Sequence, residues 1–248
     1  MNTFNEIIKL VKASERTVFL TGAGISTESG LPDFRSDNGF WTKNKPIQFS
    51  EFLLSEEKQR LSWERNLELH SLLKNIKPNI GHAFVEKIIG LQKNNFLITQ
   101  NIDGLHQKSG IPKNKIIEIH GSAIEAACLD CEAKQNVLDF HDAVKSKVPL
   151  PKCSVCGGIV KVATISFGQP MNEIDMMYAS KIVEESDLMI VMGSSLKVLP
   201  AGKLPNLAIQ SGSKLIILNR EKTRYDSSAD IVINDELQNI CSKLIEEL

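Results

Sequence analysis

The chain has 248 residues with a mass of 27.5 kDa, a formal net charge of −1, 42% hydrophobic residues and 24% charged residues. This length allows one large α/β domain, with or without an inserted module, and a sizeable core. The near-zero charge excludes bulk attraction to nucleic acid or to an anionic membrane, so we expect neither as a partner, and a charged ligand must be bound locally.

The first residues predict an amphipathic surface helix. Phe4, Ile7 and Val11 fall on one helical face, whereas Glu6 and Lys9 interrupt the apolar stretch that a signal peptide needs. The longest apolar runs have the length of a buried strand and fall far short of the roughly 20 residues that span a bilayer. We therefore expect a cytoplasmic protein.

Continuous apolar runs recur along the chain, which is typical of strands covered on both faces. The runs predict strands at residues 17–21, 95–99, 115–119, 188–192, 214–218 and 230–233. The fold class is therefore α/β, with a parallel sheet and helices on both sides. Open α/β sheets bind ligands beyond the carboxyl ends of their strands, and those ends carry Gly22, Gln100, His120, Gly193 and Asn219.

Two stretches interrupt this rhythm and are interpreted as insertions that form a small lobe. Residues 41–78 are poor in strand signals and show leucines at helical spacing, and residues 127–159 carry four cysteines. The remaining large lobe then comprises residues 1–40, 79–126 and 160–248. A cleft between the lobes is the expected binding site.

The four cysteines predict a metal site. Cys128 and Cys131 form one CxxC pair and Cys153 and Cys156 a second, which is the spacing of a tetrahedral zinc site. Four thiolates leave no position for a catalytic water, so the zinc is expected to be structural. The alternative is four unrelated buried thiols. The fifth cysteine, Cys241, fits a core position.

The sequence Thr21-Gly-Ala-Gly begins like a phosphate-binding loop after a strand, but the third glycine of a dinucleotide loop is missing. The alternative is a tight turn. A glycine and two hydroxyls at Gly193, Ser194 and Ser195 repeat the pattern at another strand end. Asn219 ends a further strand, where it either binds a ribose or caps the next segment.

Polar residues after two other strands suggest a catalytic site. Gln100, Asn101 and Asp103 combine amides with one carboxylate and suit the orientation of a sugar and an amide, although such residues are also common in turns. His120 suits a general base, although a lone histidine is more often structural. Among the other histidines, we expect His82 and His106 to support helix packing or the site through hydrogen bonds. We expect a solvated helix surface for His70 and His141.

Taken together, these motifs resemble the sirtuin family of NAD-dependent protein-lysine deacylases. The resemblance rests on motifs in family order that cover nearly the whole chain: GAGISTESGLPDFRS, TQNIDGLHQKSG, the His120-Gly121 pair, the two CxxC pairs, FGQ, GSSLKVLPAG and Asn219. It implies a Rossmann-like large lobe, a small lobe made of the helical insert and the zinc module, and an acyl-lysine peptide bound between them.

The resemblance also implies roles for individual residues. His120 would be the base, with Asn101 and Asp103 as further catalytic residues; Phe34 would lie over the reacting ribose. The residues implied in NAD binding are Gly22, Ala23, Gly24, Ser26, Asp33, Phe34, Arg35, Gln100, Asn101, Ile102, Asp103, Gly193, Ser194, Ser195, Asn219 and Arg220. The residues implied in peptide binding are Thr164, Ile165, Ser166, Phe167, Gly168 and Val198.

The implied reaction consumes NAD, releases nicotinamide and transfers the acyl group from lysine to ADP-ribose. Protein ADP-ribosylation and NAD hydrolysis are the alternatives for the same pocket. The chain departs from the family at Lys161-Val162, where many members have Arg-Pro, and at Gln169, where many have glutamate. The Tyr-x-x-Arg pair of members that remove acidic acyl groups is absent from residues 62–73, which favours an uncharged acyl group.

Overall fold

The computed structural model describes residues 3–32, 45–146, 148–150 and 152–248 of the chain. Within them, a six-stranded sheet of order β3-β2-β1-β7-β8-β9 forms the large lobe, and every neighbouring pair is parallel. Its strands are β1 (Thr17–Thr21), β2 (Phe96–Thr99), β3 (Ile116–Glu118), β7 (Leu188–Met192), β8 (Lys214–Leu218) and β9 (Ile231–Ile233). Each predicted strand is confirmed, and no strand end differs from the prediction by more than one residue.

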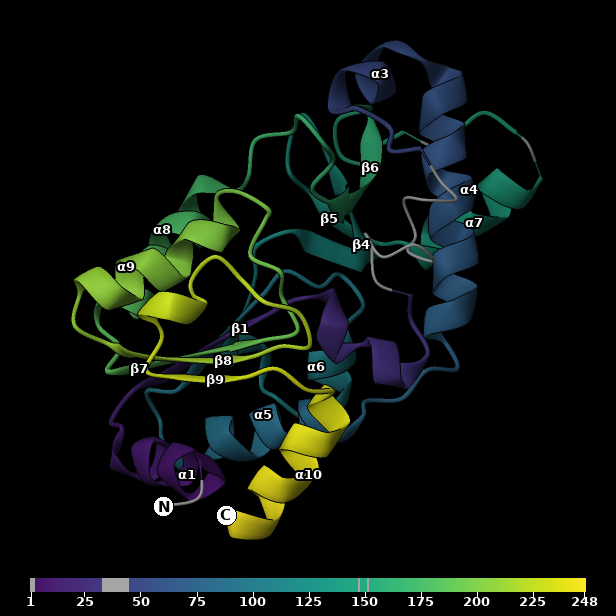
Figure 1. Ribbon diagram of the computed structural model, residues 1–248. Coiled ribbons are helices and arrows are strands. Elements are labelled where there is room, and N and C mark those ends of the chain that lie inside the picture. Colours follow the sequence, from purple (N-terminus) through teal and green to yellow (C-terminus); the bar gives the residue numbers. More distant parts are fainter. Residues whose placement is uncertain (1–2, 33–44, 147, 151) are drawn as a thin grey trace.

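Helices cover both faces of this sheet (Figure 1). One face carries α1 (Thr3–Ala13), α5 (Ile80–Leu91) and α10 (Leu237–Glu247), and the other carries α8 (Glu173–Glu184) and α9 (Leu204–Gln210). Because side chains alternate along a strand, Phe19 packs into the first layer while Val18 and Leu20 pack into the second. This two-sided burial explains why the strands are continuously apolar rather than alternating.

The strand order places the ends of β1 and β7 at a topological switch point. From β1 the chain proceeds outward through β2 to β3, and from β7 it proceeds in the opposite direction through β8 to β9. The loops after β1 and β7 therefore diverge and open a crevice at the carboxyl edge of the sheet. Short helices occupy these and other loops: α6 (Leu105–Lys108) and the 3-10 turns Ala23–Ile25, Thr27–Ser29, Lys113–Lys115, Ala201–Lys203 and Asp226–Ser228.

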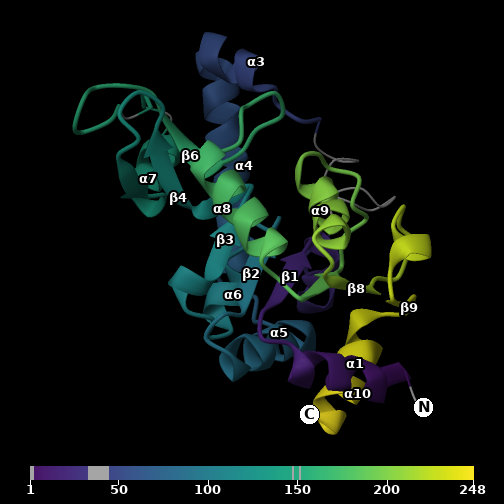
Figure 2. The same cartoon turned by 90° about the vertical axis from the view of Figure 1, so that its left-hand side faces the viewer.

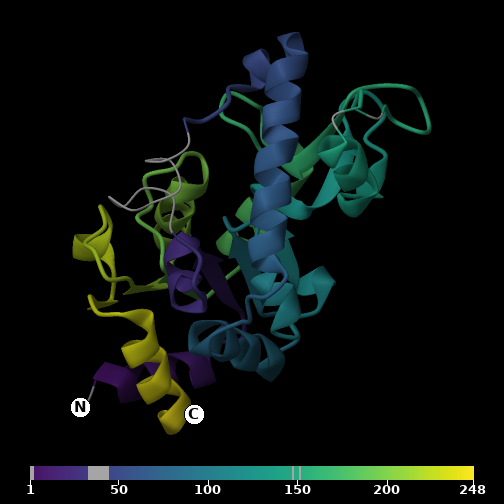
Figure 3. The same ribbon diagram turned by 90° about the vertical axis from the view of Figure 1, so that its right-hand side faces the viewer.

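The small lobe contains a second, antiparallel sheet of order β5-β4-β6 (Figures 1 and 3). Its elements are α3 (Phe49–Leu54), α4 (Glu56–Leu73), β4 (Gly121–Cys128), β5 (Lys134–Asn136), α7 (Leu138–Lys145) and β6 (Val160–Thr164). Trp63 stacks on Phe140 with ring centroids 4.9 Å apart, and Val160 and Val162 complete this separate core. The sheet starts at Gly121 and ends at Thr164, so it takes in a few residues from each side of the predicted cysteine module.

Local sequence accounts for the start of α4, the long helix of this lobe. Ser55 accepts a hydrogen bond from the backbone amide of Lys58 at 3.3 Å, and Glu56 and Glu57 lie in the first turn, where the helix dipole favours negative charge. At the other end of the molecule, α1 and α10 pack together, so the first and last helices are neighbours (Figure 2). None of the helices described is both long and apolar enough to cross a membrane.

Candidate active site

A cavity of about 620 Å³ lies between the two lobes. The loops that follow β1, β2, β7 and β8 line it from the large lobe, and α4 and the end of β6 line it from the small lobe. All the described residues implied in NAD or peptide binding line this cavity, together with His120. Asp33, Phe34 and Arg35 lie outside the described residues.

The two glycine loops contact each other backbone to backbone. The amide of Gly24 donates to the carbonyl of Gly193 at 2.9 Å, and a Cβ on Gly22 would lie 2.8 Å from that same carbonyl oxygen. Gly193 has a φ of +62°, and a Cβ there would lie 2.4 Å from the amide nitrogen of Ile25. The glycines therefore allow β1 and β7 to bring their loops into contact, and one amide expected to face a phosphate is already used within the protein.

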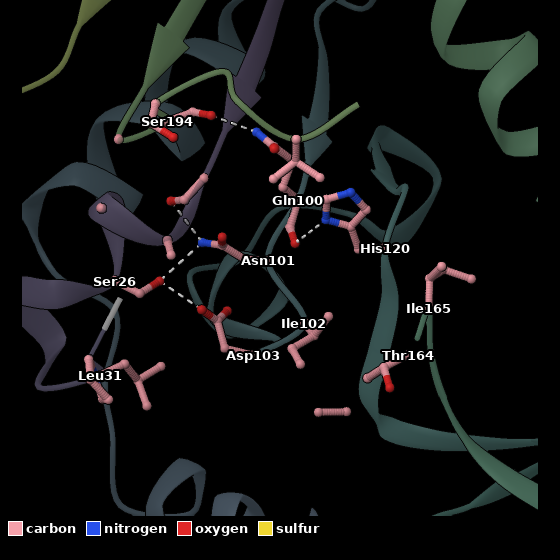
Figure 4. Close-up of a pocket in the computed structure, with 18 of the residues that line it drawn as sticks. Ser26, Leu31, Gln100, Asn101, Ile102, Asp103, His120, Thr164, Ile165 and Ser194 are labelled. Carbon is pink, nitrogen blue, oxygen red and sulfur yellow. Dashed lines mark hydrogen bonds between the residues drawn. The ribbon is translucent and has the colours of Figure 1, made fainter. Parts of the chain in front are cut away.

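A buried hydrogen-bond cluster forms the floor of the cavity (Figure 4). The side-chain amide of Asn101 donates to the hydroxyl of Ser26 at 3.2 Å, and that hydroxyl donates to Asp103 Oδ2 at 2.7 Å. Gln100 Nε2 donates to the hydroxyl of Ser194 at 2.8 Å and thereby ties the end of β2 to the loop after β7. The structure thus brings residues that follow β2 beside Ser26 and Ser194 from the loops after β1 and β7.

The side-chain oxygen of Asn101, Oδ1, is buried and has no hydrogen-bond partner among the described residues. A buried acceptor without a partner costs free energy, and such atoms usually meet a ligand or a water molecule. Oδ1 can therefore receive a hydroxyl or amide hydrogen from a ligand. This unmet acceptor, with the closely packed glycine loops and the nearby hydroxyls, fits a nucleotide that carries sugars and an amide.

Asp103 is held where its charge is costly. Burial raises the pKa of its carboxyl, and hydrogen bonds from the Leu105 amide and the Ser26 hydroxyl partly oppose that rise. The same hydrogen bond from Leu105 fixes the start of α6, which carries His106. A perturbed carboxyl in a cavity is typical of a functional group rather than a surface residue.

His120 is oriented by the main chain of the neighbouring strand end. Its Nδ1 lies 3.0 Å from the carbonyl oxygen of Gln100, which can only accept, so Nδ1 carries the hydrogen in this contact (Figure 4). In the neutral ring Nε2 is then the nitrogen that accepts a proton. This geometry suits a general base that faces the cavity.

A second layer of polar contacts supports this floor. His106 Nε2 lies 3.0 Å from the hydroxyl of Thr21, which donates to Thr99 at 2.9 Å, and the Thr99 hydroxyl accepts from the amide of Asn101 at 3.0 Å. Burial lowers the pKa of His82 to about 4 and that of His106 well below its ordinary value, so both rings are neutral at physiological pH. Their predicted supporting position is confirmed.

The segment that follows β6 lines the cavity. The amide of Ile165 donates to the carbonyl of His120 at 2.9 Å, and the carbonyl of Phe167 accepts from the amide of Phe49 at 2.8 Å. Gln169 Oε1 accepts from the amide of Ser166 at 3.1 Å, so the residue that departs from the family closes the turn. The six residues implied in peptide binding line the cavity, five of them in sequence and one from the loop after β7: Thr164, Ile165, Ser166, Phe167, Gly168 and Val198.

Asn219 follows β8, and its contacts match one of the two interpretations of the sequence. Its side-chain amide donates to the carbonyl of Glu221 at 2.6 Å and so caps the following segment, while the residue also lines the cavity. Arg220 lies beside it and is exposed, with Glu221 and Glu236 carboxylates at 3.7 and 3.5 Å. Ribose contact by Asn219 stays a prediction.

Sequence patterns did not identify the part of the cavity formed by α4. The leucine spacing predicted this helix but not its inward face, which buries Gln59, Trp63, Asn66 and Leu73. Asn66 lines the cavity, donates to the carbonyl of Ala123 at 2.9 Å, and accepts from His141 Nε2 at 3.3 Å. The expectation of a solvated surface for His141 is therefore wrong, because this hydrogen bond holds the ring inside the lobe, 6% exposed.

The four predicted metal ligands form a compact cluster in the small lobe, with all sulfur atoms within 4.8 Å of one another. The Sγ atoms of Cys128 and Cys156 are 3.5 Å apart and those of Cys131 and Cys153 are 3.7 Å apart. Tetrahedral zinc with Zn–S bonds of about 2.3 Å requires sulfur separations of about 3.8 Å, so the cluster fits zinc. None of the four lines the cavity, which agrees with a structural metal.

Comparison with known proteins agrees with this architecture. Residues 22–200 of the chain match the model of the Sir2 family. The chain is 39% identical over 241 residues to a protein of Thermodesulfovibrio yellowstonii named NAD-dependent protein deacetylase, covering 96% of this chain and 92% of that one.

Solved structures are similar over the same length. A Sir2 structure with a p53 peptide and NAD+ has a TM-score of 0.80 at 35% identity and covers 98% of this chain and 97% of the other. A structure of Sir2Tm bound to a propionylated peptide has a TM-score of 0.83 at 34% identity and covers 100% of this chain and 98% of the other. The chain therefore belongs to the Sir2 family.

Proposed function

We propose that this protein is an NAD-dependent protein-lysine deacylase, in the first place a deacetylase, that releases nicotinamide and transfers the acyl group to ADP-ribose. The observation that carries the proposal is the convergence of His120, Asn101 and Asp103 in one cavity between the lobes. The relative named a deacetylase and the Sir2 structures with NAD+ and with acylated peptide support it.

The floor of the cavity would bind and orient NAD. Ile102 and Asp103 would hold the carboxamide of nicotinamide, and the unmet Oδ1 of Asn101 would accept a hydrogen from the adjoining ribose. Ser194 and the two glycine loops would receive the phosphates, with Ser195, Asn219 and Arg220 toward the adenosine. NAD itself supplies a leaving nicotinamide and an electrophilic ribose carbon. The sequence resemblance also supports a place in the NAD pocket for Asp33, Phe34 and Arg35.

His120 would act as the general base. With Nδ1 directed at the Gln100 carbonyl, Nε2 is placed to accept a proton from a ribose hydroxyl, which makes that oxygen a stronger nucleophile toward the acyl carbon. The cavity between the lobes would hold the two substrates in contact. The protein would therefore contribute orientation and a base.

The peptide would add to the edge formed by residues 164–168 and by Val198, with the acyl-lysine side chain directed toward His120. An uncharged acyl group remains our proposal for the preferred substrate. We also propose a cytoplasmic location, supported by the zinc-type cysteine cluster, whose thiols a reducing compartment keeps available. The lobe boundaries predicted from the sequence stay part of this proposal.

A matched panel of peptides tests the function. One sequence carrying acetyl-, propionyl- or succinyl-lysine would be incubated with the protein, with and without NAD, and both nicotinamide and deacylated peptide would be measured. We expect deacylation that requires NAD and is faster for the two uncharged acyl groups. Rapid nicotinamide release without peptide would identify an NAD hydrolase, and transfer of labelled ADP-ribose to protein would identify an ADP-ribosyltransferase.

A further inference from the structure

Lys161 is a buried cation that the proposed mechanism does not use. It lies on β6 and is 2% exposed, although lysine is among the residues least often buried. The neighbouring residues Val160 and Val162 point into the small-lobe core around Trp63, whereas the Lys161 ammonium meets the opposite side of the strand and α3. A buried charge costs free energy unless its surroundings compensate it.

The compensation comes from backbone carbonyls and an aromatic ring. The ammonium of Lys161 donates to the carbonyl of Val162 at 3.1 Å and, through a short hydrogen bond, to the carbonyl of Thr164. The ring centroid of Phe52 on α3 is 5.9 Å from the same nitrogen, which is within the range of a cation–π contact. Among the described residues, no carboxylate forms a salt bridge with Lys161. Burial lowers its pKa to about 8.

These contacts sit where β6 ends and the peptide wall begins. Thr164 is the last residue of β6. Beyond it the amide of Ile165 donates to the His120 carbonyl, the amide of Phe49 donates to the Phe167 carbonyl, and Phe167 forms an isolated β-bridge with Gln48. Gly168 then turns the chain with a φ of +77°. The ammonium therefore joins the end of β6, from which the turn departs, to α3.

We propose that Lys161 is a positioning residue that fixes residues 164–169 as the docking edge for the acyl-lysine peptide. Its ammonium holds the carbonyl of Thr164 and the ring of Phe52 together, so that the backbone groups beyond β6 keep the orientation that an added strand needs. His120 is oriented separately by the Gln100 carbonyl. Loss of the Lys161 ammonium therefore affects peptide binding more than the chemical step. This part of the inference rests on the proposed function.

The kinetic test compares three variants. Lys161→Met removes the ammonium and keeps an unbranched stem, Lys161→Arg keeps a cation that can reach the same carbonyls, and Lys134→Met is the matched control on β5, where the lysine side chain is 68% exposed. We expect Lys161→Met to raise the KM for acetyl-peptide about tenfold with kcat and the KM for NAD nearly unchanged. Lys161→Arg should return the KM to within about threefold of the wild type, and Lys134→Met should not change it.

Hydrogen exchange provides a readout that does not depend on activity. In Lys161→Met the amides of residues 164–169 should exchange at least about tenfold faster, while those of β4 and β5 keep wild-type rates. Unchanged exchange in residues 164–169, acceleration throughout the small lobe, or an arginine variant as impaired as the methionine variant would each overturn the positioning role. A wild-type protein without deacylase activity would overturn the proposed function, and the exchange data would still decide the role of Lys161.

Discussion

The contact between the two glycine loops makes a quantitative prediction for Gly193. Alanine at this position must adopt the left-handed φ of +62°, and its Cβ would lie 2.4 Å from the amide nitrogen of Ile25. The left-handed backbone costs about 1–2 kcal/mol for a residue other than glycine. Forcing the loops apart adds about 1–3 kcal/mol, the range measured for overpacked cores. We therefore expect Gly193→Ala to lower the free energy of unfolding by about 2–5 kcal/mol.

Two other glycines test the backbone cost and the steric cost separately. Gly212 has a φ of +85° with nothing within 4 Å of an added Cβ, so Gly212→Ala carries only the backbone cost of about 1–2 kcal/mol. Gly22 has a φ of −132°, so Gly22→Ala carries only the steric cost, from contacts of 2.8 Å with the Gly193 carbonyl and the Ser194 Cβ. Its expected loss is about 1–3 kcal/mol.

Urea unfolding followed by circular dichroism measures these losses, and calorimetric titration with NAD measures the effect on the site. Gly22→Ala and Gly193→Ala should weaken NAD binding about tenfold or more, which corresponds to about 1.4 kcal/mol, whereas Gly212→Ala should leave it unchanged. If Gly193→Ala and Gly212→Ala lose equal stability and bind NAD equally, the close approach of the loops does not determine the site.

Three further predictions concern charge and metal. Cys131→Ser, or a strong zinc chelator, should destabilise the β5-β4-β6 sheet, and proteolysis between residues 128 and 156 should accelerate. Asp103→Asn should abolish most deacylation. In urea unfolding, the stability of the wild type relative to this variant should be lower at pH 8 than at pH 5. The reason is that burial raises the pKa of this carboxyl, so its ionisation opposes folding. His82 is neutral in the folded protein because burial lowers its pKa to about 4, so the wild type should lose up to about 3 kcal/mol as the pH falls from about 6.5 to 4. For His82→Asn, urea unfolding across this pH range should give a slope of unfolding free energy against pH that is smaller by about one proton. An unchanged slope would contradict the assignment.

The large-lobe sheet was predictable because its strands are buried on both faces and therefore leave continuous apolar runs in the sequence. Strand β4 was not predicted, since Gly121–Cys128 contains mostly small and polar residues and only Ile124 is β-branched. It is nevertheless a strand because pairing with β6 and the packing of Ala126 in the small-lobe core stabilise it. Tertiary context here overrides a weak local preference.

The strand ends predicted the convergence of the site, because parallel strands bring their carboxyl ends to one edge of the sheet. What could not be predicted is which polar residues of the small lobe turn inward. Asn66 and His141 are far apart in sequence and look like surface helix residues, yet each satisfies the other's hydrogen bond inside the lobe. Lys161 was visible as a departure from the family pattern, but its burial depends on α3, which packs on it from a distant part of the chain.

The central claim is that removal of the acyl group is coupled to cleavage of NAD in the cavity that contains His120. The most direct measurement is the ratio of nicotinamide released to lysine freed from an acetyl-lysine peptide, in the wild type and in His120→Ala. We predict one nicotinamide for each lysine in the wild type and, in the variant, loss of deacylated peptide with a folded, NAD-binding protein. Free lysine formed without NAD, or formed at the wild-type rate by His120→Ala, would contradict the account.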